Sequence, residues 1–204
     1  MRKCYPVGLL AAVLTLAMFL HPGRAGEDGF VKLFNGKDLT GLKITPEKAT
    51  DTFKAEDGVL KVSGKPNAYF YTDKSYKNFI LRFDWRYPDR AGNSGLLVYI
   101  QPPQKVWPKC VEVQGAYGSH GQIFAIGGAK GKYTNDTKAR KAALKPHQEW
   151  NQTEVISKDG YLTAKVNGVV VAEGQTEALT EGPLGWQSEG APIEFRDIVL
   201  KELK

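Results

Sequence analysis

The residues best suited to chemistry lie in strand-like segments where charged or amide side chains alternate with apolar ones. Glu112 and Gln114 stand two apart in one such segment, and Glu194 and Arg196 stand two apart in another. Side chains at positions i and i+2 share one face of a strand. A carboxyl group shielded from water is suited to proton transfer, and an arginine can donate to sugar hydroxyls or to a developing oxyanion. If the two strands are neighbours, we expect these groups to converge on one concave sheet; for Glu112, a solvent-facing strand position is the competing interpretation.

Two further candidates lie in loops beside the predicted strands. Asn93, in a Gly-Asn-Ser-Gly turn, is placed to bind a hydroxyl at the edge of a cleft, although the same residues also suit a plain hairpin turn. His120 follows the Glu112 segment and could act as an acid or base, or could be an incidental loop histidine. Three indole rings could stack on a pyranose, those of Trp107, Trp150 and Trp186. For each ring, a position in the hydrophobic core is the alternative.

Other catalytic signatures are missing from the sequence. There is no Gly-x-Ser-x-Gly elbow, no phosphate-binding loop and no Cys/His cluster with zinc spacing. The histidines are His21, His120 and His147. The sequence therefore gives no support for triad chemistry or for a Cys/His zinc site.

The elements that must position these residues are short strands, and the predicted class is an all-β sandwich. No segment has sustained helical periodicity, and short alternating runs recur between Gly- and Pro-containing turns. The strongest predicted strand is 79–87, and Asp-Gly or Asn-Gly turns predict a hairpin over 53–62 and a meander over 153–172. Other predicted strands are 30–34, 96–100 and 110–114.

Two regions depart from this simple pattern. In the tail, Ile193 and Phe195 are out of phase with Ile198 and Leu200, which predicts a β-bulge near Arg196. The lysine-rich stretch 127–145 has little apolar content. We expect it to be a solvated loop over one end of the sandwich, with a substrate-covering lid as the alternative.

The first 25 residues predict a signal peptide, so the mature chain is expected to be one domain over residues 26–204. A basic start precedes an apolar run over 7–20 and a small-x-small pattern ending at Ala25. Cleavage would remove three cations and reduce the formal charge from +6 to +3, which gives no support for nucleic-acid binding. Cys110 would then be the only cysteine, in an apolar strand pattern that predicts a buried thiol.

At these residues the chain resembles the 3-keto-disaccharide hydrolase domain family. The similar segments, in chain order, are FVKLFNGKDLTGLK, NSGLLVYI, CVEVQ, KPHQEWNQTEVISKDGYLTAKVNG and GPLGWQSEGAPIEFRDIVLKEL. Together they span nearly all of the mature chain. The resemblance implies a concanavalin A-like jelly-roll sandwich, exported in bacteria and acting on carbohydrate.

The resemblance also implies a reaction. A 3-keto group makes the C2 proton of a sugar acidic, a base removes that proton, the C1 substituent leaves, and hydration completes a net hydrolysis. The resemblance carries over Glu112 and Arg196, and we hypothesise that Glu112 is the base or acid and Arg196 the oxyanion partner. His120 is a further catalytic candidate because of its place in the loop after the Glu112 segment. The resemblance also carries over Asn93, Gln114 and Gln187 as substrate-binding residues, with Arg86 as a weaker addition. Trp186, from its indole, and Glu194, from the strand pattern, are further substrate-binding candidates.

The chain departs from the family pattern in two places. Gln114 is followed by Gly115-Ala116-Tyr117 where many relatives have an aspartate, and Gln187 is followed by Ser188-Glu189-Gly190 where many have Asp-His-Gly. These departures suggest either altered specificity or a non-catalytic carbohydrate-binding module. No cofactor is predicted, and a divalent metal is left open.

The expected partner is therefore a sugar, either a 3-keto-glycoside or a polysaccharide. A partner oxidoreductase that makes the keto-sugar is left open. We expect an exported protein, periplasmic or secreted, with no nucleic-acid partner and no stable membrane insertion after signal cleavage. A structural adhesion protein of the cell envelope is a third, weaker interpretation.

Overall fold

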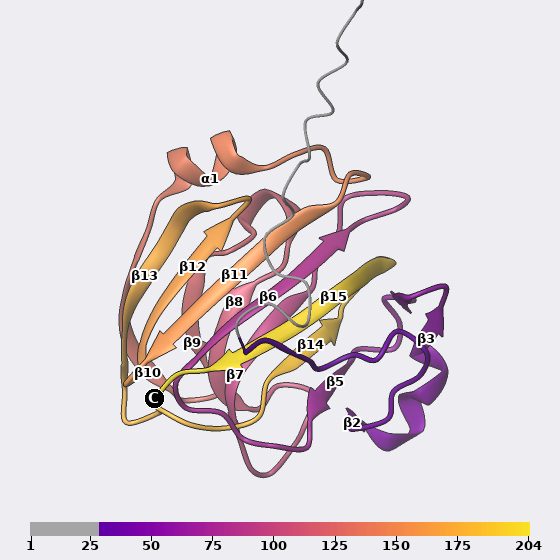
Figure 1. Cartoon of the computed structure of the whole chain (residues 1–204), viewed down its shortest axis with the longest axis horizontal. Coiled ribbons are helices and arrows are strands. Elements are labelled where there is room, and N and C mark those ends of the chain that lie inside the picture. The colour runs from indigo at the N-terminus through magenta and orange to yellow at the C-terminus, as the bar shows by residue number, and fades with distance from the viewer. Residues whose placement is uncertain (1–28) are drawn as a thin grey trace, which may run out of the picture.

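The computed structural model describes residues 29–204, so the predicted signal peptide lies outside the described residues. Two antiparallel sheets pack face to face as a jelly-roll sandwich, which confirms the predicted fold class (Figure 1). Within this range, no helix has the length and apolar content needed to cross a membrane.

The larger sheet has nine strands in the order β10-β13-β12-β11-β6-β15-β4-β3, with β1 added beside β15. Its strands are β1 (Val31–Lys32), β3 (Phe53–Glu56), β4 (Val59–Val62), β6 (Phe79–Arg86), β10 (Lys130–Asn135), β11 (Asn151–Lys158), β12 (Tyr161–Val166), β13 (Val169–Glu177) and β15 (Ile193–Glu202).

The smaller sheet has six strands in the order β2-β5-β14-β7-β8-β9. They are β2 (Leu42–Thr45), β5 (Ala68–Thr72), β7 (Gly95–Gln101), β8 (Lys109–Gln114), β9 (Ile123–Ile126) and β14 (Gly185–Ser188). The helical segments are η1 (Glu47–Thr52), η2 (Tyr117–Ser119) and α1 (Thr137–Ala143).

The core lies between the sheets and is filled by the apolar half of each alternating strand. In β6, Phe79, Leu81, Phe83 and Trp85 are buried while the residues between them are half-buried. Trp186 of β14 stacks on Phe70 of β5, with ring centroids 5.1 Å apart and planes 7° apart. Such ring pairs add roughly 0.5–1.5 kcal/mol beyond the burial of their area.

Several local predictions are confirmed. The register of β15 against β6 shifts between Arg196 and Val199, and Asp197 has a φ of 50°, as the predicted bulge requires. The hairpin β3–β4 and the meander β11–β12–β13 are present. Cys110 is buried, and burial raises the pKa of its thiol.

Two local predictions are wrong. The stretch 127–145 is a strand and a helix, because β10 pairs with β13 and Asp136 caps α1 by accepting a hydrogen bond from the Ala139 amide. The Gly-Asn-Ser-Gly segment is not a hairpin turn but a crossover, since it connects β6 of one sheet to β7 of the other. This crossover carries Asn93 to the tail segment, where it bridges Glu189 and Gly190.

Candidate functional site

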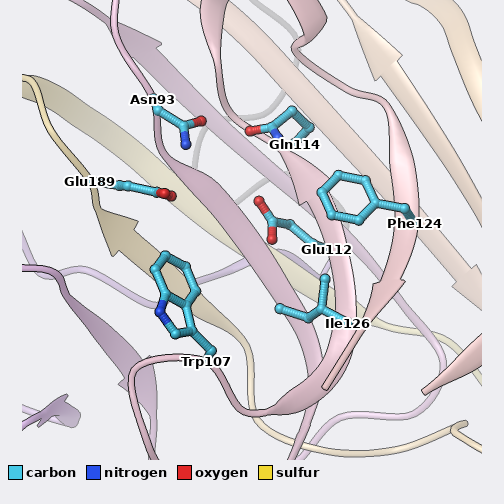
Figure 2. Close-up of a pocket in the computed structure, with 7 residues that line it drawn as sticks. All are labelled: Asn93, Trp107, Glu112, Gln114, Phe124, Ile126 and Glu189. Carbon is cyan, nitrogen blue, oxygen red and sulfur yellow. The ribbon is translucent and has the colours of Figure 1, made fainter. Parts of the chain in front are cut away.

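The outer face of the six-stranded sheet carries a polar pocket of about 330 Å³ (Figure 2). Its lining residues come from β8, β9, the β6–β7 crossover, the β7–β8 connection and the end of β14. They are Asn93, Trp107, Glu112, Gln114, Phe124, Ile126 and Glu189. Figure 2 shows the two carboxylates, Glu112 and Glu189, pointing into the same space with the Trp107 indole below them.

Glu112 reaches this pocket because of strand alternation. Its neighbours Val111 and Val113 fill the core between the sheets, so Glu112 must project from the opposite face. The register places Leu97 of β7 on one side of it and Phe124 of β9 on the other. The Glu112 side chain is thus held among apolar neighbours, and the residue is only 5% exposed.

The electrostatics of the pocket favour a protonated Glu112 at neutral pH. Burial, followed by the charge of Glu189, raises the pKa of Glu112 to about 8. The pKa of Glu189 is also raised by burial, although a hydrogen bond with Asn93 opposes the shift. The two carboxyl groups can therefore differ in protonation at pH 7, which is the arrangement that acid–base catalysis needs.

Gln187 and Gly95 complete the inner wall of the site. Gln187 is 2% exposed, and within residues 29–204 neither its Oε1 nor its Nε2 has a hydrogen-bond partner. Oδ1 of Asn93 is buried and unpartnered in the same part of the chain. A Cβ at Gly95 would clash with Oε1 of Gln187 and Oε1 of Glu112, so both side chains occupy the space that this glycine leaves. Buried polar atoms that have no hydrogen-bond partner beside a pocket are a physical reason to expect a polar ligand there.

The Gln114 side chain is oriented by the backbone amides of the next two residues. Its Oε1 accepts hydrogen bonds of 2.8 Å from the amides of Gly115 and Ala116. This fixes the carbonyl side of the amide toward the turn after β8. The Nε2 group is the donor that Gln114 can offer to a ligand in the pocket.

The structure brings together four of the sequence-predicted residues, Asn93, Glu112, Gln114 and Gln187, but it separates them from Arg86, Glu194 and Arg196. The strands β8 and β15 lie in different sheets, so the expected convergence of Glu112 with Arg196 is wrong. Arg86, Glu194 and Arg196 lie on the nine-stranded sheet, where Arg86 pairs with Glu194 at 2.7 Å and Arg196 pairs with Asp84 at 3.2 Å.

Trp186 is also misplaced by the sequence prediction. It stacks on Phe70 in the core and is 1% exposed, so it cannot touch a ligand in this pocket. It is adjacent in sequence to Gln187, and consecutive strand residues face opposite sides. Because Gln187 faces outward, Trp186 faces inward.

His120 is buried in a polar network away from the pocket lining. Its ring stacks on Trp85 with centroids 3.8 Å apart, Nδ1 lies 3.1 Å from the Gly115 carbonyl oxygen, and Nε2 lies 2.7 Å from the Thr153 hydroxyl oxygen. Burial lowers its pKa to about 3, so the ring is neutral. In that state Nδ1–H donates to Gly115 and Nε2 accepts from Thr153, which is a packing role rather than the expected acid or base role.

Sequence reasoning missed Glu189, Phe124 and Ile126 as pocket residues. Glu189 stands two residues after Gln187, so the period-2 rule that grouped Glu112 with Gln114 could have found it. Phe124 and Ile126 have the same spacing in the strand that follows Glu112. Over residues 29–204, no group of three or more His, Cys, Asp or Glu side chains is arranged to hold a metal ion.

The fold and the site together define a jelly-roll sandwich with a carboxylate-lined pocket on the outer face of one sheet. A model of the 3-keto-alpha-glucoside-1,2-lyase-like domain matches residues 29–201. The chain belongs to this family, as its sequence motifs predicted. The sequence matches no curated protein.

Solved structures agree with this assignment. A protein from Parabacteroides distasonis assigned to the glycosyl hydrolases is 26% identical, with a TM-score of 0.65 over 86% of this chain and 94% of the other. A second such structure from the same organism is 23% identical, with a TM-score of 0.67 over 86% and 100% of the two chains. A carbohydrate-binding module from Bacillus subtilis, at 11% identity, has a TM-score of 0.55 over 89% and 100% and shares the fold. The family and the 26%-identical structure support a carbohydrate-active protein of the glycosidase type, whereas the other two structures support the fold alone.

Proposed function

We propose that this protein is an exported hydrolase that cleaves the glycosidic bonds of 3-keto-glycosides by elimination followed by hydration. The observation that carries the proposal is Glu112: a carboxyl group with a pKa of about 8, shielded in a pocket beside a second carboxyl group and unpartnered amides. A carboxylic acid that stays protonated at neutral pH is suited to protonating a leaving group.

In the first step Glu189 acts as the base and Glu112 as the acid. The Glu189 carboxylate takes the C2 proton, and the electron pair of that bond forms the C1–C2 double bond. The C1–O bond breaks, and Glu112 gives its proton to the departing oxygen. The products of this half are an unsaturated keto-sugar and a free alcohol or sugar.

In the second step the roles reverse. Glu112, now a carboxylate, takes a proton from water as the oxygen bonds to C1, and Glu189 returns its proton to C2. Both carboxyl groups end in their starting states, and the net change is the addition of water across the glycosidic bond.

The negative charge that develops on the C3 oxygen needs hydrogen-bond donors, and we assign these to side-chain amides. Asn93, Gln114 and Gln187 each carry an NH₂ group at or beside the pocket. They take the role of oxyanion partner that was predicted for Arg196. The amide hydrogen bonds are strongest where burial has already removed competing water, as at Gln187.

A turnover assay tests the proposal directly. Purified mature protein, residues 26–204, is incubated with 3-keto-trehalose and a 3-keto-glucoside, with unoxidised trehalose as control. Release of 3-keto-glucose from the oxidised sugars alone, and its loss in Glu112→Gln, is the expected result. Equal turnover in wild type and Glu112→Gln would refute the assigned role.

A non-catalytic carbohydrate-binding module is the second candidate, and Trp107 favours it. This indole lines the pocket and is 45% exposed, which suits stacking on a sugar ring. A binder predicts glycan retention that depends on Trp107 and no turnover on any oxidised sugar. The same assay therefore separates the two functions.

Export and a partner enzyme complete the proposal. Residues 1–25 would direct the chain to the periplasm or the medium and be removed there. The substrate carries a ketone at C3, so a sugar oxidoreductase must oxidise the C3 hydroxyl first.

A further inference from the structure

Arg196, which the sequence predicted for the active site, lines a second pocket instead. It has a volume of about 380 Å³ and lies on the outer face of the nine-stranded sheet, whereas the Glu112 pocket lies on the outer face of the other sheet. Its lining residues are Asp84, Lys145, Trp150, Gln152, Asn167, Gly168 and Arg196.

An indole in this second pocket is held in a fixed orientation. The guanidinium carbons of Arg196 and Arg86 lie 4.1 Å and 4.5 Å from the centroid of the Trp150 ring. Each arginine is in turn anchored by a carboxylate of the neighbouring strand, Asp84 for Arg196 and Glu194 for Arg86. An aromatic group that is already ordered loses little entropy when a ligand binds.

The polar groups around the indole form a mixed set of donors and acceptors. Nε2 of Gln152 donates to Oδ1 of Asp84 at 3.3 Å, and Nζ of Lys145 donates to the backbone oxygen of Trp150 at 3.3 Å. The cations Lys145 and Arg196 are balanced by Asp84 and by Asp197, which lies 3.8 Å from Nε of Arg196. A pocket without excess charge, with amides, carboxylates and an indole, suits a neutral ligand with many hydroxyl groups.

We propose that this pocket, defined by Trp150, Lys145, Asp84 and Arg196, is a second glycan-binding site for a neutral pyranose polymer, separate from the Glu112 pocket. The proposal rests on the carbohydrate-active family of the chain and not on the 3-keto reaction. The hydrophobic core separates the two pockets, so one glycan residue cannot occupy both. The second site holds the protein on a polysaccharide while the first remains free for turnover.

Two tryptophan variants test this separation. Retardation of the mature protein in native gels containing dextran, laminarin or galactomannan measures binding to neutral polymers, and polygalacturonate serves as the acidic comparison. Wild type and Trp107→Ala are expected to be retarded by at least one neutral polymer. Trp150→Ala is expected to weaken that binding at least tenfold while its turnover of a small 3-keto-glucoside stays within twofold of wild type.

Lys145→Ala provides the same test if Trp150→Ala does not fold, because this lysine is at the pocket and not in the core. It is expected to weaken retardation without changing the thermal midpoint. The proposal is overturned if wild type binds none of the neutral polymers, if only polygalacturonate binds, or if Trp150→Ala and Lys145→Ala both bind as wild type does. Retardation without any turnover by wild type would refute the enzymatic function and leave the second site supported.

Discussion

Glu154 and Glu112, which lie on opposite outer faces of the sandwich, have pKa shifts of opposite sign. On the nine-stranded sheet, Glu154 is bound by Arg82 at 2.5 Å and by Lys165 at 2.8 Å. Burial would raise the pKa of Glu154, but these partners outweigh it and hold the pKa below its ordinary value. On the six-stranded sheet, Glu112 faces Glu189 and its pKa rises to about 8.

This difference separates carboxylates that stabilise the sheet from carboxylates suited to chemistry. A paired carboxylate stays ionised across the physiological range and joins neighbouring strands. A shielded carboxylate beside another carboxylate retains its proton and can transfer it. Both kinds occupy the same type of alternating strand, so the contrast arises from which sheet each strand joins.

The largest expected effect contrasts Glu112→Gln with Glu154→Gln. Loss of a general acid or base lowers kcat/KM by about 100- to 10,000-fold, so we expect this range for Glu112→Gln on a 3-keto-glucoside. Glu154→Gln, on the other face, is expected to stay within threefold of wild type. Similar losses in both variants would mean that the two faces do not differ in function.

The second contrast is between Trp186 and Trp107. Trp186→Ala is expected to reduce the free energy of unfolding by about 3–5 kcal/mol because it opens a cavity between the sheets. Trp107→Ala should change it by less than about 0.5 kcal/mol, since this indole is half-exposed at the pocket rim. Urea denaturation measures both, and a stable Trp186→Ala protein would contradict the core position of the ring.

The pH dependence of stability should differ in sign between Glu112 and Glu154. The raised pKa of Glu112 means that the folded state binds its proton more tightly than the unfolded state does, so its contribution falls as the pH rises from 4.5 to 8. The loss amounts to about 4 kcal/mol over that window. Glu154, with a lowered pKa, contributes stability at neutral pH that is lost on acidification.

Urea titrations at pH 5 and pH 8 check both signs. Relative to wild type, Glu112→Gln is expected to gain stability at pH 8, whereas Glu154→Gln is expected to lose stability there. If the wild type and Glu112→Gln lose the same free energy between the two pH values, Glu112 has an ordinary pKa.

The smallest effect compares two glycines. Gly95→Ala would push a Cβ against Gln187 and Glu112, and overpacking of this kind costs roughly 1–3 kcal/mol. The affinity of Gly95→Ala for substrate should also fall. Gly118→Ala is the matched control, because nothing lies within 4 Å of its added Cβ. Equal stability and KM in the two variants would show that Gly95 does not shape the pocket.

The sequence predicted strands, turns and the tail bulge well because these depend on local alternation and on Asp-Gly or Asn-Gly turns. It placed Glu112 and Gln114 on one face for the same reason. Which strands share a sheet depends on long-range packing, and here the assumption that β8 and β15 are neighbours failed. The placement of Arg196 and Glu194 at the Glu112 site was wrong for this reason.

Other misses have separate physical causes. Trp186 and Gln187 were both predicted to bind the ligand. Consecutive strand residues face opposite sides of a sheet, so only one of the two can line the pocket. His120 looked exposed in a Gly-rich loop, but Trp85 and Thr153 bury it from two different strands. The lysine-rich stretch can form β10 because the exposed face of an edge strand tolerates charged side chains. It continues into α1, which Asp136 caps.

The most direct test of the central claim is the pH profile of kcat/KM for the mature protein on a 3-keto-glucoside. If Glu112 acts as the acid, activity falls as the pH rises through about 8, and Glu112→Gln has lost both the activity and this limb of the profile. A profile that stays flat through pH 8, with Glu112→Gln as active as wild type, would contradict the account.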